Sequence, residues 1–132
     1  MTKENAHPSV AILKTLQPLK DLDSLTLESL SREIEIYSAP RNSTLVALDS
    51  DEQTTLFLLE GEIQLIARDG NSFLINAKDA AARQPICQLR PTRYHCQTVS
   101  RVRYLRIEND IFDRFLPFEN HSSLFDQESL ES

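Results

Sequence analysis

The sequence predicts a mainly β protein: an antiparallel β-roll or jelly-roll barrel with short helices near its N-terminus and a closing helix near its C-terminus. The 132-residue chain contains two glycines, Gly61 and Gly70, and both fall within residues 56–70. Glycine adopts positive φ without strain, so these two positions predict turns. Gly61 separates two strand-like runs, residues 55–60 and 62–67, and Gly70 belongs to an Asp-Gly pair between apolar runs. Such a pair is a strong hairpin signal.

Two short helices are expected before the first strand. Apolar residues recur at helical spacing from residue 10 onward, and Pro18 should end this first helix near residue 17. The second helix is expected over residues 26–33, with Thr26 or Ser24 as its N-cap. The leucines of both helices are expected to pack into the core.

Short apolar or alternating runs predict the remaining strands of the roll. They cover residues 34–37, 44–46, 73–75, 94–98 and 102–107. A closing helix is expected over residues 110–116, where Ile111 and Phe115 lie on one face and Pro117 ends the helix.

Length and composition indicate one domain. A chain of 132 residues with 40% hydrophobic residues can form one core. We expect a flexible N-terminus over residues 1–9, one domain over residues 10–116 and an acidic C-terminal tail over residues 117–132. No apolar run approaches the length of a membrane span, and no secretory signal precedes the domain, so we expect a cytoplasmic protein without membrane contact.

Charge argues against nucleic-acid binding. The net charge is −6, whereas phosphate backbones favour basic surfaces. The residues after Leu116 are acidic, and no groove-reading helix is expected there. The apolar residues Leu124, Phe125 and Leu130 could contact a protein partner or a second copy of the chain, and a frayed end is an equal alternative.

The order and spacing of these elements resemble the cyclic-nucleotide-binding domain, the β-roll of catabolite-activator-type regulators, kinase regulatory subunits and gated channels. The resemblance covers residues 10–116. The leucine-rich helical entry corresponds to residues 13–30, the strand that ends in glycine to residues 56–61, and the closing segment to residues 102–116. The resemblance implies a non-catalytic regulatory or sensor module.

The ligand cassette of that family corresponds here to a stretch similar to a divergent bacterial branch. The stretch is Ala82-Arg83-Gln84-Pro85-Ile86-Cys87-Gln88-Leu89-Arg90-Pro91-Thr92-Arg93-Tyr94. The resemblance implies that a Gly-Glu pair at a short helix and an arginine about ten residues later would hold the ribose and the cyclic phosphate. The candidate ligand residues are Arg83, Arg90, Arg93, Tyr94, Ala82 and Thr92.

This cassette departs from the family pattern in three ways. Residues 80–83 contain neither the glycine nor the acid. Thr92 aligns with the arginine position, and Arg93 is one residue away, so strand alternation should turn Arg93 from the pocket. Tyr94 replaces a usual alanine, and its ring should intrude on the ligand space. We therefore expect a degenerate module that does not bind cAMP or cGMP in the usual way.

Other interpretations stay open. The module could be a genuine receptor for cAMP, cGMP or another nucleotide. Six of the ten arginines lie in residues 83–106, so Arg83, Arg90 and Arg93 could form a different site for a small phosphate ligand. Alternatively, these arginines are solvated or paired with acids such as Asp79 and Glu108.

Enzymatic activity is not expected, and neither is a resident cofactor or metal. A cupin-like metalloenzyme needs a His-x-His pair, whereas His7, His95 and His121 lie far apart in the sequence. The sequence also lacks a nucleophile-elbow motif and a glycine-rich phosphate loop. Cys87 and Cys96 are expected to be small core residues.

Overall fold

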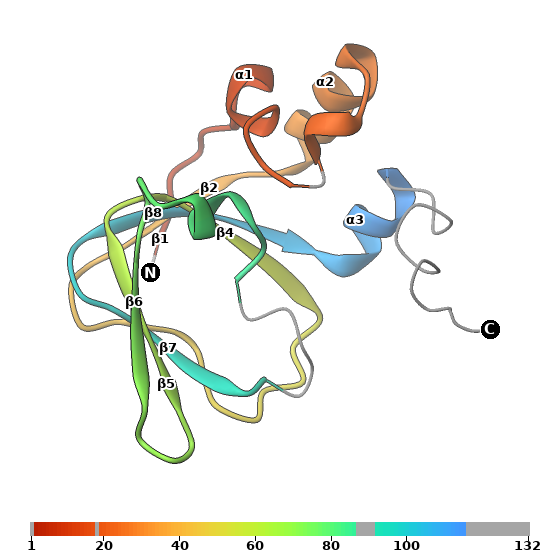
Figure 1. Cartoon of the computed structure of the whole chain (residues 1–132). Coiled ribbons are helices and arrows are strands. Elements are labelled where there is room, and N and C mark those ends of the chain that lie inside the picture. Colours follow the sequence, from red (N-terminus) through yellow and green to blue (C-terminus); the bar gives the residue numbers. More distant parts are fainter. Residues whose placement is uncertain (1, 18, 87–91, 116–132) are drawn as a thin grey trace.

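The computed structural model describes residues 2–17, 19–86 and 92–115, which form two antiparallel sheets with helices above one of them (Figure 1). The first sheet has the strand order β1 (Thr2–Lys3), β2 (Ile36–Ala39), β8 (Val102–Glu108), β4 (Thr54–Glu60). The second has the order β3 (Thr44–Val46), β7 (Tyr94–Thr98), β5 (Glu62–Ala67), β6 (Ser72–Asn76). The predicted mainly β roll is confirmed, although the described strands form two sheets and not one closed barrel.

Short helices precede, interrupt and follow the strands. They are α1 (Val10–Leu13), the 3-10 helix η1 (Leu19–Asp21), α2 (Ser24–Glu33), the 3-10 helix η2 (Ala80–Arg83) and α3 (Asn109–Phe115). None of the helices in the described part of the chain has the length and apolar character of a membrane span.

Two expectations about the first helices need correction. Helix α1 covers four residues, so it ends well before the expected boundary, and Pro18 lies outside the described residues. The N-cap of α2 is Asp23, whose carboxylate accepts a hydrogen bond from the Thr26 backbone N–H, and neither Thr26 nor Ser24 caps the helix. Aspartate caps a helix as well as serine does, so composition alone did not separate these neighbouring positions.

The first nine residues, which we expected to be flexible, make several contacts with the first sheet. Strand β1 pairs antiparallel with β2, and Glu4 N–H donates to the Ile36 carbonyl at 2.8 Å. The His7 ring lies 2.7 Å from the Ile34 carbonyl through its Nδ1 atom. The N-terminal segment is therefore part of the first sheet.

The core has two compartments, one on each face of the first sheet. The outer face packs against the helices through Leu13, Leu16, Leu19, Leu27, Leu30, Ile34, Ile36, Phe57, Leu105 and Ile107. The inner face meets the second sheet through Ala39, Val46, Leu56, Leu58, Ile63, Ala77, Ala82, Ile86, Cys96, Val102 and Tyr104. Strand β4 lies between both compartments, which explains why its apolar run is continuous rather than alternating.

Both glycines occupy the turns that the sequence predicts. Gly61, between β4 and β5, has φ of +93°, and Gly70, in the β5–β6 turn, has φ of +94°. A Cβ atom on Gly61 would lie 2.3 Å from the Arg101 carbonyl oxygen, whereas a Cβ atom on Gly70 would meet open space. Gly61 thus lets the β4–β5 and β7–β8 turns pack directly against each other.

Candidate functional site

The candidate cassette begins at η2, in the connection between the β5–β6 hairpin and β7. Ala82 is completely buried in the inner compartment, so its side chain serves packing in this structure. Ile86 N–H donates to the Leu56 carbonyl at 2.9 Å and forms an isolated bridge to β4. The first part of the cassette is thereby attached to the first sheet.

Thr92, at the position that the family resemblance assigns to arginine, is 1% exposed. Its hydroxyl donates to the Ala47 carbonyl at 2.6 Å and accepts from the Ser50 backbone N–H at 2.9 Å. Backbone hydrogen bonds join Thr92 to Ser50 and Asp49 as well. This side chain therefore holds the loop between β3 and β4, and both functions of its hydroxyl are already used.

Arg93 is exposed, and Tyr94 is half-buried. Tyr94 has the same strand parity as the buried Thr92 and Cys96, which places it on the inner face of β7 and Arg93 on the other. The Tyr94 ring meets Phe73 edge to face, with ring centroids 6.0 Å apart. Arg93 and Tyr94 line an open cavity of about 470 Å³ at the hairpin turn, together with Ala67, Arg68 and Asp69.

Arg83 is half-buried at the end of η2, and its Nη2 atom donates to the Ala77 carbonyl at 2.6 Å. Its Nε atom is buried without a hydrogen-bond partner. A buried N–H group without an acceptor costs free energy, so this atom is the one unsatisfied donor among the candidate residues that the structure describes.

Of the three candidate arginines, the structure describes Arg83 and Arg93. Arg83 does not line the cavity that contains Arg93, and Arg90 lies outside the described residues, as does Cys87. Cys96 is fully buried, as expected for a small core residue. In the described part of the chain, no group of three or more histidine, cysteine, aspartate or glutamate side chains is arranged to hold a metal ion.

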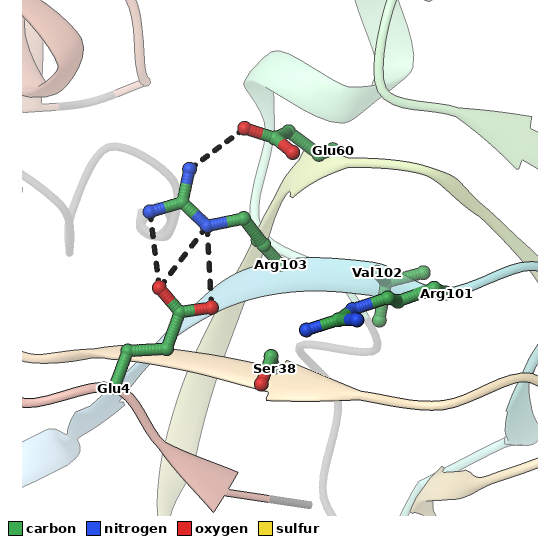
Figure 2. A pocket seen from close by; sticks show the side chains of 6 residues that line it. All are labelled: Glu4, Ser38, Glu60, Arg101, Val102 and Arg103. Carbon is green, nitrogen blue, oxygen red and sulfur yellow. Dashed lines mark hydrogen bonds and ion pairs between the residues drawn. The ribbon is translucent and has the colours of Figure 1, made fainter.

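A second cavity, of about 570 Å³, lies on the outer face of the first sheet, and sequence reasoning missed it. Figure 2 shows the side chains that line it. They are Glu4, Ser38, Glu60, Arg101, Val102 and Arg103.

Arg103 is the centre of this second cavity. Its Nε atom lies 3.2 Å from both carboxylate oxygens of Glu4, and its Nη1 atom donates to Glu60 at 2.7 Å (Figure 2). Hydrogen bonds to Glu4 first, and then to Glu60, raise the pKa of Arg103 above its ordinary value. The cation therefore joins the N-terminal segment, β8 and the end of β4.

No sequence signal could have assembled this cluster. Glu4 and Arg103 are 99 residues apart, and only the pairing of β2 with both β1 and β8 brings them together. Arg103 belongs to the arginine-rich residues 83–106, but its partners Glu4 and Glu60 lie outside that stretch.

No protein-family model matches this chain, and no curated protein sequence matches it. Solved structures do. The sensor domain of the transcriptional regulator DNR from Pseudomonas aeruginosa matches with a TM-score of 0.69 at 12% identity, over 94% of this chain and 98% of that one.

Two further solved structures match with similar scores. The regulatory domain of Toxoplasma gondii protein kinase A, crystallised with cAMP, gives a TM-score of 0.68 at 13% identity, over 83% of this chain and 44% of that one. A cyclic nucleotide-binding domain from Methylobacillus flagellatus gives 0.64 at 17% identity, over 81% and 63%. This chain therefore spans less than two thirds of the length of each of these two matched chains. The two-sheet roll, its helical layer and these matches together show that the chain has the fold of the cyclic nucleotide-binding domains.

Proposed function

We propose that this chain is a non-catalytic regulatory or sensor module that has the cyclic nucleotide-binding fold but does not bind cAMP or cGMP through the usual cassette. The hydrogen bonding of Thr92 carries this proposal. In the family, the corresponding arginine would direct a guanidinium group at the cyclic phosphate. Here the residue is neutral and buried, and its hydroxyl both donates a hydrogen bond to the β3–β4 loop and accepts one from it.

The neighbouring residues support the same proposal. Arg93 is turned to the outer face of β7 by strand alternation, so it does not replace the missing cation. Ala82, at the helix of the cassette, carries no acid for a ribose hydroxyl and is fully buried. A cyclic nucleotide would meet neither a guanidinium group nor a carboxylate from these three positions.

Calorimetric titration of the purified chain with cAMP and with cGMP tests this proposal. We expect no saturable heat for either nucleotide at concentrations where a receptor with a micromolar dissociation constant, about −8 kcal/mol, would saturate. A low-micromolar dissociation constant for either one would overturn the proposal.

One observation favours a second candidate function, a receptor for a different phosphate-bearing ligand. The buried Nε atom of Arg83 has no partner, and a phosphate oxygen is a suitable acceptor for it. Ligand that binds only the native state raises stability by about 2.7 kcal/mol at 100 times its dissociation constant. A thermal-shift screen of nucleotides and inorganic phosphate therefore tests this second function: a ligand that binds should raise the melting temperature of the chain.

The variant Arg83→Ala should abolish any such shift, whereas Arg41→Ala, at an exposed arginine in the β2–β3 turn, should keep it. If the wild-type chain shows no shift with any of these compounds, the second candidate fails and the first one stands.

A further inference from the structure

The cavity on the outer face of the first sheet contains one arginine that is paired and one that is not. Arg103 forms ion pairs with Glu4 at 3.1 Å and with Glu60 at 2.7 Å. Arg101 lines the same cavity, but in the described part of the chain no hydrogen bond or ion pair occupies its guanidinium group. Figure 2 shows this side chain pointing toward Ser38. The cavity therefore presents an unpaired cation beside a paired one.

The charges that line this cavity are separated. Two carboxylates, of Glu4 and Glu60, surround the single guanidinium group of Arg103, so this cluster carries one net negative charge. Arg101, two residues before Arg103, adds one positive charge, and the lining as a whole is neutral. A phosphate dianion at Arg101 would be repelled by the two nearby carboxylates. A ligand that carries one positive and one negative group matches both parts of the lining.

Both parts of the lining have hydrogen-bonding capacity left. Glu60 uses its Oε2 atom for Arg103, and its side chain is 60% exposed, so its second carboxylate oxygen can accept from an ammonium group. The Ser38 hydroxyl has no partner among the described residues. An unpaired guanidinium group holds a carboxylate through two parallel hydrogen bonds. Arg101 and Ser38 thus suit a carboxylate, and Glu60 suits an ammonium group.

The backbone that carries Arg101 is held in place before any ligand binds. Its carbonyl oxygen packs against Gly61, where a Cβ atom would lie only 2.3 Å away, and accepts a hydrogen bond from the Ser100 hydroxyl at 3.1 Å. The next residue, Val102, is 1% exposed and pairs with Ala39 of β2. Ordering of mobile segments weakens binding, and here a ligand has to order little beyond the arginine side chain itself.

We propose that this cavity binds a small zwitterion, an α-amino acid, with its carboxylate on Arg101 and Ser38 and its ammonium group on Glu60. The volume of about 570 Å³ is in the range of small-molecule sites. Among the described residues that line the cavity, the one apolar residue is the buried Val102, so a small or polar amino acid fits better than an aromatic one. The site lies on the outer face of the first sheet, so it goes beyond the proposed function and does not depend on it.

Nitrogen–proton correlation NMR of the full chain, titrated with glycine and with L-serine, tests the site. We expect saturable shifts of the amide signals of residues 38, 60 and 101–103 with at least one of the two. Glycinamide and serinamide lack the carboxylate, and acetate and β-hydroxypropionate lack the ammonium group. Each analogue should bind at least about tenfold more weakly than its amino acid, because a hydrogen bond to a charged group is lost.

Three results of these titrations would overturn the proposal. They are the absence of saturable shifts with both amino acids, equal affinity for an amino acid and its deaminated analogue, and tighter binding of inorganic phosphate than of either amino acid. None of them bears on the titration with cAMP and cGMP, so the two proposals fail separately.

Two variants test the two ends of the site. Arg101→Gln should remove the preference for glycine over glycinamide, and Glu60→Gln should remove the preference for glycine over acetate, or the corresponding serine preferences. Both residues are exposed, so the fold should be kept, and the same spectra show whether it is. The matched control is Arg41→Gln, at an exposed arginine outside the lining, which should bind as the wild type does. An Arg101→Gln chain with wild-type affinity would exclude this site.

Discussion

Gly61 combines two constraints at one residue, and Gly70 has only one of them. Both have positive φ, which costs an alanine about 1–2 kcal/mol. At Gly61 a Cβ atom would in addition lie 2.3 Å from the Arg101 carbonyl and 2.8 Å from Cγ1 of Val102. The close approach is a property of two turns that the chain brings together, not of the local backbone.

Urea denaturation should separate these two constraints. We expect Gly70→Ala to lower the free energy of unfolding by about 1–2 kcal/mol. Gly61→Ala should lower it by clearly more, because the backbone of the β7–β8 turn must also move. Equal losses for the two variants would mean that the contact between the turns adds nothing to stability.

Thr92 is a second residue whose importance comes from its partners. Thr92→Val keeps the shape of the side chain but removes both hydrogen bonds of the hydroxyl, so the Ser50 N–H and the Ala47 carbonyl keep only their longer bond to each other, at 3.3 Å. We expect a loss of about 1–3 kcal/mol in the free energy of unfolding, because two hydrogen bonds of about 0.5–1.5 kcal/mol each are removed. The control Thr15→Val removes an exposed hydroxyl and should change stability little. If Thr92→Val were as stable as the wild type, the hydrogen bonds of this hydroxyl would not contribute to the stability of the fold.

Among the elements, β1 shows most clearly how a short strand is held by distant residues. It contains two residues, too few for any periodic signal, and it pairs with β2 in the first sheet. Beyond the strand, Arg103 holds Glu4 through its Nε and Nη2 atoms. Lys3 adds an ion pair with Glu35 at 3.4 Å.

Glu4→Gln should therefore loosen β1 locally. We expect faster amide hydrogen exchange in residues 2–6, while global stability changes by less than about 1 kcal/mol because the pair is partly exposed. Glu28→Gln, at an exposed position on α2, should leave the exchange of residues 2–6 unchanged. Unchanged exchange in Glu4→Gln would show that backbone pairing alone holds the strand.

At the scale of the whole molecule, the first sheet is shared by two core compartments, and Tyr104 lies in the inner one. Its ring stacks on Tyr37 with centroids 5.7 Å apart, and the side chain is almost fully buried. Burial raises the pKa of Tyr104 above its ordinary value of 10.0, and the nearby Arg106 opposes this shift in part.

A pH dependence of stability follows from this burial. Because the folded chain resists ionisation of Tyr104, the stabilisation is complete below the pKa of an unfolded tyrosine, about 10, and is lost as pH rises through the higher folded pKa. Urea denaturation from pH 8 to pH 11 should show a declining free energy of unfolding above about pH 10, and a shallower decline for Tyr104→Phe. If the two proteins gave parallel curves, the decline in stability would not come from the ionisation of Tyr104.

Local pattern was enough to predict most of the elements. Alternation and the Asp-Gly pair predicted β5 and β7 with their observed bounds, and β4, β6, β8 and α3 within one or two residues, because each depends on neighbours in sequence. The resemblance of their order to a known β-roll then predicted the fold.

The contacts that determine the candidate site were set by tertiary structure. Whether Thr92 faces a ligand space or a loop depends on where Ala47 and Ser50 lie, 45 and 42 positions earlier in the chain. The cluster of Arg103 with Glu4 and Glu60 likewise needs the N-terminal segment to meet strands β4 and β8. Hydrogen bonds and ion pairs act over a few ångströms in space and leave no trace in sequence spacing when loop closure joins distant segments. The sequence by itself therefore determined the strands, their turns and their order, and only the packing of the two sheets decided which polar side chains became structural.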